Sequence, residues 1–450
     1  MRPRAAALAF VLVLAFRAGG WAVASEIVFG GEAGIRSVLT VSPRLDQLVE
    51  LLLRSEYTAI VAVHGDAVRL SAAATVWHQT PVTGSDAPHE HGVLLDEVRL
   101  SIASGDRLTF DVGRFPHAGG RAMIASPNDP FAAASFDRLL RGDLSGSATP
   151  QTLAIARVFM RYGYAALTLM PVPKVPQLLA SGSIWIPAMP LDRTIDDTEL
   201  SDEPVTLGEI FAESTRSIEE PYRRISGGVE AGFTAGPVDL SLVYYHGIDP
   251  NPVPRARISF PLVPPLTYDL SFAPEEVVID SFGLIAESAF GSATFWIDAA
   301  YVPNRTLATT QIDRYSKRTR LIGAPTIRGV AGASYRVQDL NLLLLAEYHH
   351  THSFLPVGVP AESVVRTPLV SDLVVAAQVS AGAEQTWKLS AGGIVSLDDA
   401  SGIVLVSLDR ESWSGLAVSL SVPVFVGAAS TSYGQYGDIF NVAATLRYGF

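Results

Sequence analysis

The chain has 450 residues, of which 48% are hydrophobic and 17% are charged, with a formal net charge of −12 and no cysteine. The missing cysteines exclude disulfide bonds, and the chain lacks the basic patch that a nucleic-acid-binding protein needs. After the N-terminus, no apolar run reaches the roughly 18 residues of a membrane-spanning helix, so the many apolar residues are dispersed along the chain.

The N-terminus has the pattern of a secretory signal peptide. Arg2 and Arg4 precede an apolar core over residues 5–16, and Ala22-Val23-Ala24 forms a small-residue cleavage site. The alternative is a membrane anchor, but the apolar core is short and Arg17 follows it directly. We therefore expect residues 1–24 to be removed and residues 25–450 to act outside the cytoplasm.

The first strand is predicted near residues 27–41. The following segment, Leu45 to Leu53, is open to two interpretations, a strand or a short helix. Further along, tight turns alternate with longer connections, as periplasmic turns alternate with extracellular loops in an outer-membrane barrel. The tight turns are predicted at His64-Gly65-Asp66, Ser104-Gly105-Asp106, Tyr162-Gly163, Gly236-Pro237, Gly291-Ser292, Gln338-Asp339, Ala383-Glu384 and around Ser412. The longer connections are predicted at 79–92, 115–150, 172–222, 248–276, 303–325, 351–370, 398–401 and 426–438.

The connection at 115–150 is the predicted constriction loop. It combines small residues with charged ones, and Phe131 and Phe136 give it apolar surface to bury. Loops of this length without regular structure are usually functional or disordered. We expect this loop to fold into the barrel, with an outward-facing mobile loop as the alternative. Its candidate constriction residues are Arg114, Arg121, Asp129 and Arg138.

The connection at 172–222 is the second candidate for a loop at the pore. Thr206 and Glu209 form a capping box, which predicts a short amphipathic helix that carries Ile210 and Phe211. Most of the excess negative charge of the chain lies between Pro190 and Glu220. We expect this acidic stretch to hang at the pore entrance and favour cations, with a solvated surface loop as the alternative.

The later segments show the clearest strand pattern, in which every second residue is apolar. In residues 294–301, Phe295, Ile297 and Tyr301 alternate with polar or bulky residues such as Asp298. The same alternation covers residues 341–348 and 372–379, and it ends in residues 439–450 with a face of apolar and aromatic side chains. Alternation over this many segments predicts an all-β protein, a transmembrane antiparallel β-barrel of about 16 to 18 strands.

Charged residues inside these predicted strands must face the lumen, because a charge in lipid at mid-depth costs about 2–4 kcal/mol. We expect them to create a transverse field that orients polar solutes. The alternative is an ordinary lumen wall in which opposite charges pair. The pore-lining candidates are Arg69, Glu97, Arg99, Asp111, Arg157, Arg161, Glu230, Arg328 and Glu347.

Two stretches make the chain resemble bacterial single-chain outer-membrane porins. Val112-Gly113-Arg114 is similar to the strand end before an inserted loop in these proteins, and residues 126–130, Ser-Pro-Asn-Asp-Pro, are similar to a stretch of that loop. A Trp-Gly pair that is common between the two is absent here. The terminal Tyr448-Gly449-Phe450 resembles the signal that the barrel-assembly machinery reads. The resemblance implies a bacterial outer-membrane location, contact with outer-membrane lipid, and possible homo-oligomers.

The expected function is passive diffusion or facilitated uptake of small polar solutes, without a chemical step. No catalytic motif or cofactor-binding motif is present, and the histidines of residues 89–91 and 349–352 match no specific metal site, so no catalytic, cofactor or metal residue is predicted. Two alternatives stay open. Inward Leu343, Leu345 and Val374 fit a barrel that moves hydrophobic substrates through a lateral gap, and the loops at 172–222 and 248–276 fit an adhesin or structural barrel.

Overall fold

The computed structural model describes most of the chain from Glu26 onward. The described residues are 26–42, 48–64, 68–81, 90–117, 119–123, 126–131, 133–134, 148–172, 194–195, 198–199, 225–250, 253–259, 269–313, 318–364, 370–382, 386–411, 415–429, 431–437 and 440–449. The predicted signal peptide and most of the connection at 172–222, including its predicted helix, lie outside these residues.

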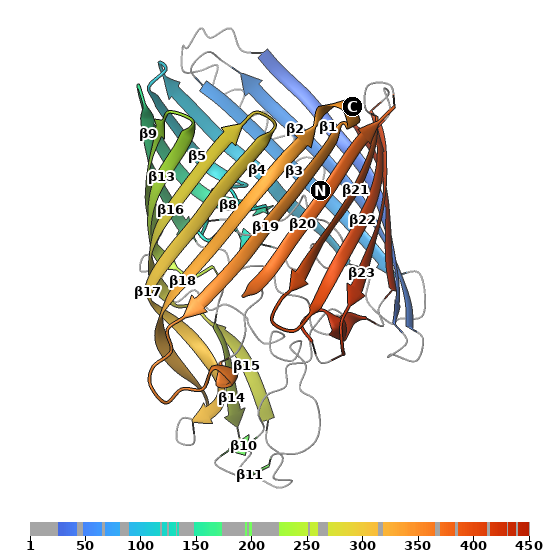
Figure 1. The fold of residues 1–450 in the computed structure, drawn as a ribbon. Helices are drawn as coiled ribbons and strands as arrows, with labels where there is room; N and C mark the ends of the chain where they lie inside the picture. Colours follow the sequence, from blue (N-terminus) through green and yellow to red (C-terminus); the bar gives the residue numbers. More distant parts are fainter. Residues whose placement is uncertain are drawn as a thin grey trace.

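Within the described residues, 18 antiparallel strands pair in chain order and close into a barrel (Figure 1). These strands are β1 (Glu26–Ser42), β2 (Leu48–His64), β3 (Val68–Pro81), β4 (Glu90–Ser104), β5 (Leu108–Phe115), β8 (Gln151–Met160), β9 (Gly163–Val172), β12 (Ser226–Ala235), β13 (Val238–Ile248), β16 (Val278–Phe290), β17 (Ala293–Asp313), β18 (Arg318–Val337), β19 (Leu342–Ser353), β20 (Ser371–Ala381), β21 (Trp387–Ser396), β22 (Ser401–Glu411), β23 (Leu416–Val426) and β24 (Phe440–Gly449). The first and last strands join from Glu32 opposite Gly449 to Val41 opposite Phe440. The predicted antiparallel barrel is confirmed, at the upper limit of the predicted strand count.

The predicted turns mark one end of the barrel, which we call the turn end. Turns occupy residues 105–107, 161–162, 236–237 and 291–292, and a 3-10 turn, η3, covers Gln338–Leu340, all as predicted. The other three predicted turns, at His64-Gly65-Asp66, at Ala383-Glu384 and around Ser412, lie outside the described residues, except that His64 ends β2. At the opposite end, the loop end, the connection predicted at 398–401 is a tight turn over 397–400, in which Ala400 has a left-handed φ of 55°.

The segment Leu45 to Leu53 forms no helix where it is described, because β2 begins at Leu48 and pairs with β1 throughout. Within the described residues, helical structure is limited to short 3-10 turns such as η3, η4 (Ala361–Ser363) and η6 (Gly434–Tyr436). In this part of the chain, no helix has the length and the apolar character needed to cross a membrane.

The predicted connection at 303–325 was wrong, because β17 and β18 continue through it beyond the barrel. Their pairing shifts between Val302 and Arg305, where Pro303 and Pro325 cannot donate to the ladder. Past this bulge, Leu307, Ile322 and Ala324 form a small apolar core with Leu355, Val359 and Val364 of the next connection. The prolines predicted a loop here, but their local effect is a bulge, past which the paired strands β17 and β18 extend beyond the barrel.

The predicted connection at 248–276 likewise contains a hairpin, formed by β14 (Val253–Ser259) and β15 (Asp269–Glu275). It contacts β18 where Arg257 lies opposite Arg318. Figure 1 shows β14, β15 and the far halves of β17 and β18 projecting together from the loop end. We call this part the protrusion. Pro254 and Pro274 lie opposite each other in its hairpin, and Pro423 lies in β23 opposite Leu405.

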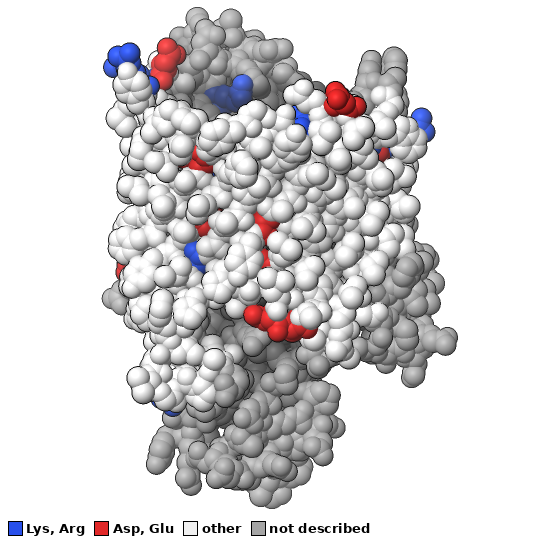
Figure 2. Space-filling view, in the orientation of Figure 1, with Lys and Arg blue, Asp and Glu red and all other residues white. Residues whose placement is uncertain are grey.

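The strand faces are oriented as their alternation predicts. On β17, Phe295, Ile297 and Tyr301 are exposed, whereas Trp296 and Asp298 are buried on the inner side. The outward and inward faces predicted for β19, β20 and β24 agree in the same way where the side chains are described. Exposed apolar side chains on a closed sheet have no protein to pack against, so this surface suits lipid. Figure 2 shows one such face, which is mostly uncharged, with larger charged spots toward its two ends.

Aromatic side chains border this apolar surface at both ends of the barrel. The belt at the turn end contains Tyr162, Phe290, Phe295, Tyr335, Trp387 and Tyr448, and the belt at the loop end contains Tyr244, Phe282, Tyr301 and Tyr348, all exposed. The distance from Phe282 to Phe290 on β16 is about 26 Å along the strand at about 3.3 Å per residue, and a tilt of about 40° reduces it to about 20 Å. This height is close to the apolar band of about 25 Å in membrane barrels.

Candidate functional site

The connection after β5 turns into the barrel. The backbone N–H of Arg121 donates to Asp298 Oδ2 over 3.1 Å, and the N–H of Met123 donates to Glu347 Oε1 over 2.7 Å. Both acceptors lie on inner faces, of β17 and β19. Around the ring, β8, β9, β12, β13 and β16 stand between β5 and β17. The described residues 116–117, 119–123 and 126–131 of this connection therefore run along the inside of the wall, and we call them the inner loop.

Asp298 is the main anchor of the inner loop. Its side chain is 0% exposed and accepts three hydrogen bonds from the loop: from the N–H of Arg121, from Ser126 Oγ over 2.5 Å and from Asn128 Nδ2 over 2.6 Å. A buried carboxylate without partners is costly, and hydrogen bonds to a charged acceptor are about twice as strong as neutral ones. The loop and the wall therefore depend on each other at this position.

Asn128 fits into a notch in the wall. Its Nδ2 also donates to the carbonyl oxygens of Leu284, over 3.2 Å, and Ala299, over 2.9 Å, which are paired residues on β16 and β17. The notch exists because Gly283 has no side chain: a Cβ atom there would lie 1.6 Å from Asn128 Oδ1. Close contact of the loop with the wall thus requires glycine at this point of β16.

Glu347 forms a second polar anchor. Besides the N–H of Met123, its carboxylate accepts from Trp296 Nε1 over 3.2 Å and contacts His349 Nε2 at 3.1 Å. The residue is 1% exposed, and Trp296 and His349 are also buried. The predicted lumen position of Glu347 is therefore an inner-wall position, but its carboxylate is covered by its partners and does not face open solvent.

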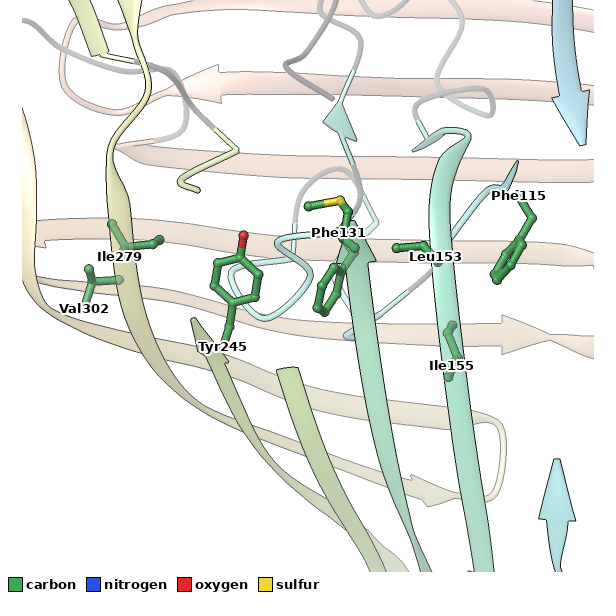
Figure 3. Packing of buried hydrophobic residues seen from close by; sticks show 8 residues of the cluster. Phe115, Phe131, Leu153, Ile155, Tyr245, Ile279 and Val302 are labelled. Atoms are coloured by element: carbon green, nitrogen blue, oxygen red, sulfur yellow. The ribbon is translucent and has the colours of Figure 1, made fainter. Parts of the chain in front are cut away.

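Apolar contacts hold the end of the inner loop. The ring of Phe131 packs edge-on against Tyr245 of β13, with the centroids 5.3 Å apart (Figure 3). The surrounding cluster comes from β5, β8, β9, β13, β16 and β17 and consists of Phe115, Phe131, Leu153, Ile155, Met170, Tyr245, Ile279 and Val302. Burying a phenylalanine side chain contributes about 1.5–3 kcal/mol, so Phe131 is a strong apolar anchor.

Hydrogen bonds within the inner loop fix its shape. Asp129 is buried and accepts from the N–H of Gly119, and it contacts His117 Nδ1 at 2.8 Å. Gly120 has a left-handed φ of 74°, and a Cβ atom there would lie 1.9 Å from Ser126 Oγ. Of the predicted constriction residues, Asp129 therefore shapes the loop from within. The side chain of Arg121, half exposed, forms an ion pair with Glu287 of β16.

A group of basic side chains occupies another part of the inner wall. Arg99 Nη2 lies 2.9 Å from Asp111 Oδ1, and Arg157 Nη1 lies 3.2 Å from Asp111 Oδ2. Ser101 Oγ donates to the same carboxylate over 2.6 Å. The Asp111 side chain is buried, while those of Arg99 and Arg157 remain 37% and 31% exposed. Arg69 on β3 is exposed nearby, opposite Ser101. We call Arg69, Arg99 and Arg157 with Asp111 the basic arc; it has more positive than negative charges.

The other pore-lining candidates lie at separate places on the inner wall. Glu230 on β12 accepts a hydrogen bond from Tyr164 Oη. Glu97 on β4 accepts from Ser71 Oγ over 2.5 Å. Arg328 on β18 lies opposite Ala300, which is buried on the inner face of β17. The structure thus gives no single cluster of all the candidates, and their role in conduction stays a prediction.

One predicted position needs correction. Arg161 belongs to the turn after β8, where it is exposed and lies over the ring of Tyr162, and not to the lumen wall. Arg114 lies in β5 next to Phe115. Its Nε and Nη2 atoms are buried and have no hydrogen-bond partner among the described residues, and its role at the constriction stays a prediction. Arg138, the fourth predicted constriction residue, lies outside the described residues.

Sequence analysis did not single out Asp298 and Asn128 as site residues. Alternation placed Asp298 on an inner face, and Asn128 lies in the porin-like stretch, but neither pattern shows that the two meet. They are separated by 170 positions in the chain. A signal was present in residues 294–301, where Asp298 is an acidic residue in a strand that must be sheltered from lipid.

A second loop covers part of the loop end and depends on Asp399. This carboxylate accepts from Ser401 Oγ over 2.6 Å and from the N–H of Ser432 over 2.7 Å. The N–H of Tyr433 donates to Ser401 Oγ over 3.2 Å, and the buried ring of Tyr436 packs on Phe425 at 5.4 Å. We call residues 427–429 and 431–437 the cap loop. Partial burial opposes ionisation of Asp399, but the hydrogen bonds from Ser401 and Ser432 outweigh it and lower its pKa from 3.8 to about 2.

The cap loop is therefore expected to resist acid. A lowered folded-state pKa stabilises the fold above the unfolded value of 3.8, and this contribution is lost as the pH falls toward about 2. Near-UV circular dichroism, which follows buried Tyr433 and Tyr436, should stay constant from pH 7 to pH 4 and change only below it. In Asp399→Asn the signal should differ at pH 7 already. A transition of the unmodified protein well above pH 4 would contradict this account.

The histidines of β19 lie on both faces of this strand. Among the residues whose side chains are described, no group of three or more His, Asp or Glu is arranged to hold a metal ion. His349 contacts Glu347 inside, whereas His350 and His352 are stacked with each other on the outer face, with ring centroids 6.3 Å apart. Residues 82–89, including His89, lie outside the described residues.

Comparisons with known proteins give similarity to solved structures alone. No protein family model matches the chain, and no curated protein matches it. Solved structures that resemble it include the outer membrane protein opdK from Pseudomonas aeruginosa, with a TM-score of 0.45, 9% identity and coverage of 94% of this chain and 99% of that chain. A Salmonella typhi OmpF complex with daunomycin has a TM-score of 0.43, 9% identity and coverage of 94% and 97%. A mutant Rh. blastica porin has a TM-score of 0.39, 13% identity and coverage of 94% and 100%. At such values the fold assignment depends on the strand pairings given above.

Proposed function

We propose that the protein is a porin-like channel of the bacterial outer membrane, through which small polar solutes diffuse. One observation carries this proposal: a closed barrel with an apolar outer face holds, on its inner face, a loop that is anchored by buried carboxylates. A soluble barrel has no reason to expose two aromatic belts with an apolar band between them. The function needs no chemical step, and we assign none.

Barrel size supports an aqueous lumen. Barrels of about eight strands are filled by their own side chains, whereas those of 16 to 18 strands leave a channel. In this barrel the inner loop covers the wall from β5 to β17, so it narrows the lumen from one side. The exposed guanidinium groups of Arg99 and Arg157 would then meet passing solutes.

The fixed charges of the inner wall support a transverse field across the lumen. The basic arc lies on β3, β4, β5 and β8, and the acidic residues Glu230, Glu287 and Glu347 lie on β12, β16 and β19. Polar solutes with a dipole would align between these two sets as they pass. The predicted cation selectivity of the acidic connection at 172–222 stays a prediction, because most of that segment lies outside the described residues.

Removal of the basic arc should shift the ion selectivity toward cations. Arg99→Gln/Arg157→Gln loses two positive charges in the lumen, and a change of this size in the local potential should lower the anion-to-cation permeability ratio by about two- to fivefold. The measurement is the reversal potential across a planar bilayer in a KCl gradient. Arg410→Gln is the matched control, because Arg410 lies over Trp387 on the outer face at the turn end. An unchanged ratio in the double variant would count against the role of the arc.

The membrane and the assembly partners complete the proposal. Export through a cleaved signal peptide, insertion by the barrel-assembly machinery through the C-terminal segment that ends at Phe450, and a location in the outer membrane fit the apolar outer face. Liposome swelling tests the transport function directly. Vesicles that contain the protein should swell in uncharged sugars at rates that fall steeply with sugar size. Swelling no faster than that of protein-free vesicles, for the smallest sugar, would contradict diffusion through the lumen.

The protrusion supports a second role, the binding of a partner outside the cell, which corresponds to the adhesin alternative. It extends the barrel beyond the membrane level with paired strands and a small apolar core of its own. Replacement of residues 249–277 by a short glycine-serine linker should abolish adhesion and leave conductance unchanged. The transport of hydrophobic substrates through a lateral gap has no such support, since the described strands pair without a break around the ring.

A further inference from the structure

The outer face of the barrel has a groove that no other part of the described chain fills. Its volume is about 670 Å³, and it spans β12, β13, β16, β17 and β18. The lining includes Ala231, Leu242, Leu284, Ala299, Tyr301 and Ile327. The large side chains stand at its sides, while Ala231 and Ala299 give it a low floor. The groove opens toward lipid, because its large lining side chains Leu242, Leu284, Tyr301 and Ile327 are exposed.

A row of aromatic side chains forms the edge of the groove that lies nearer the loop end. Tyr244 pairs with Phe282, Phe282 with Tyr301, and Tyr301 with Ile327 on neighbouring strands. The rings of Tyr244 and Phe282 are tilted against each other at 5.2 Å. Aromatic rings of this kind lie at the boundary between hydrocarbon and head groups. The groove, which lies on the turn-end side of this row, is therefore at the depth of the acyl chains.

On the loop-end side of this row, Asp280 has a carboxylate oxygen that is free to accept a hydrogen bond. Tyr244 Oη donates to Asp280 Oδ1 over 2.8 Å, and His246 Nδ1 lies 2.9 Å from the same oxygen. Asp280 Oδ2 accepts no hydrogen bond from the described residues, and the side chain is 49% exposed. Asp280 precedes Phe282 by two positions on the same outward face of β16, so this carboxylate lies on the loop-end side of the groove.

We propose that this groove binds one membrane lipid with a primary ammonium in its head group. One acyl chain lies in the groove, where it contacts side chains from five strands, and the ammonium pairs with Asp280. A chain on a smooth surface contacts protein on one side, whereas a chain in a groove is enclosed and gains more contacts. The proposal requires a membrane-embedded barrel but does not require that the barrel conducts.

Native mass spectrometry of the full chain, released from detergent with added phosphatidylethanolamine, tests the groove. Ala299→Trp fills the floor, and Ala346→Trp is the control, because Ala346 is an exposed outward residue of β19 beyond the groove. We expect one tightly held lipid in the unmodified protein and in Ala346→Trp, and none in Ala299→Trp. Equal numbers in all three proteins would overturn the proposal.

The head group is tested with phosphatidylglycerol of the same acyl chains. The unmodified protein should bind phosphatidylethanolamine about two- to fivefold more tightly, the range expected for one exposed ion pair, and Asp280→Asn should lose this preference. No preference in the unmodified protein, or the same preference in Asp280→Asn, would overturn the assignment to an ammonium. Planar-bilayer conductance of the same samples keeps the two proposals apart, because loss of lipid binding with normal conductance affects only this one.

Discussion

Replacement of Asp298 by alanine is expected to release the inner loop from the wall and produce a wider, noisier channel. The substitution removes the shared acceptor of the Arg121 N–H, Ser126 Oγ and Asn128 Nδ2. Hydrogen bonds to a charged group each contribute about 1.5–3 kcal/mol, so the loss of three weakens docking of the loop by about 4 kcal/mol or more. This corresponds to roughly a thousandfold change in the equilibrium between the docked and the released loop.

Single-channel recording measures this effect as a larger mean conductance with frequent transitions between levels. Asp409→Ala is the matched control, since Asp409 is a partly buried carboxylate of β22 that accepts a hydrogen bond from Ser407 of the same strand. The control removes the same charge without a contact to the inner loop. If both variants conduct alike, the effect comes from charge and Asp298 does not act as an anchor.

The second large effect is expected at Gly283. In Gly283→Ala the new Cβ would lie 1.6 Å from Asn128 Oδ1, so the loop must move or the wall must bend. Overpacking of this kind typically costs about 1–3 kcal/mol, and the displaced Asn128 also loses its bonds to the wall. We expect a conductance change in the direction of Asp298→Ala, together with a lower temperature of thermal unfolding.

Two variants separate this effect from a general loss of sheet stability. Gly329→Ala on β18 introduces the same methyl group where nothing lies within 4 Å, and it should behave as the unmodified protein. Asn128→Ala in combination with Gly283→Ala should add little to either single change, because both disrupt one contact. Additive effects in the double variant would show that Gly283 matters for another reason.

The barrel itself could be predicted because its strands carry a local pattern. An outward face must be apolar and an inward face tolerates charge, so alternation in residues 294–301 or 439–450 already determines which side faces lipid. The boundaries were less certain where two local signals compete. Pro303 and Pro325 predicted a loop, but the strands continue past them through a bulge.

The site could be predicted only in part, because it is formed by contacts between distant segments. The inner loop was expected from its length and from Phe131, and Arg99, Asp111 and Arg157 were expected on the inner wall. The acceptor of the loop, Asp298, lies on a strand far along the chain, and nothing in its local sequence differs from an ordinary inward residue. Which carboxylate meets which loop donor depends on the position of the strands around the ring.

The central claim is that a water-filled path runs through this barrel across a membrane. Stepwise conductance of the purified protein in a planar lipid bilayer tests it most directly. We predict discrete increments of current as single barrels insert, with a size that grows in proportion to the KCl concentration. A bilayer that stays silent at every salt concentration, with protein shown to be inserted and folded, would contradict the channel.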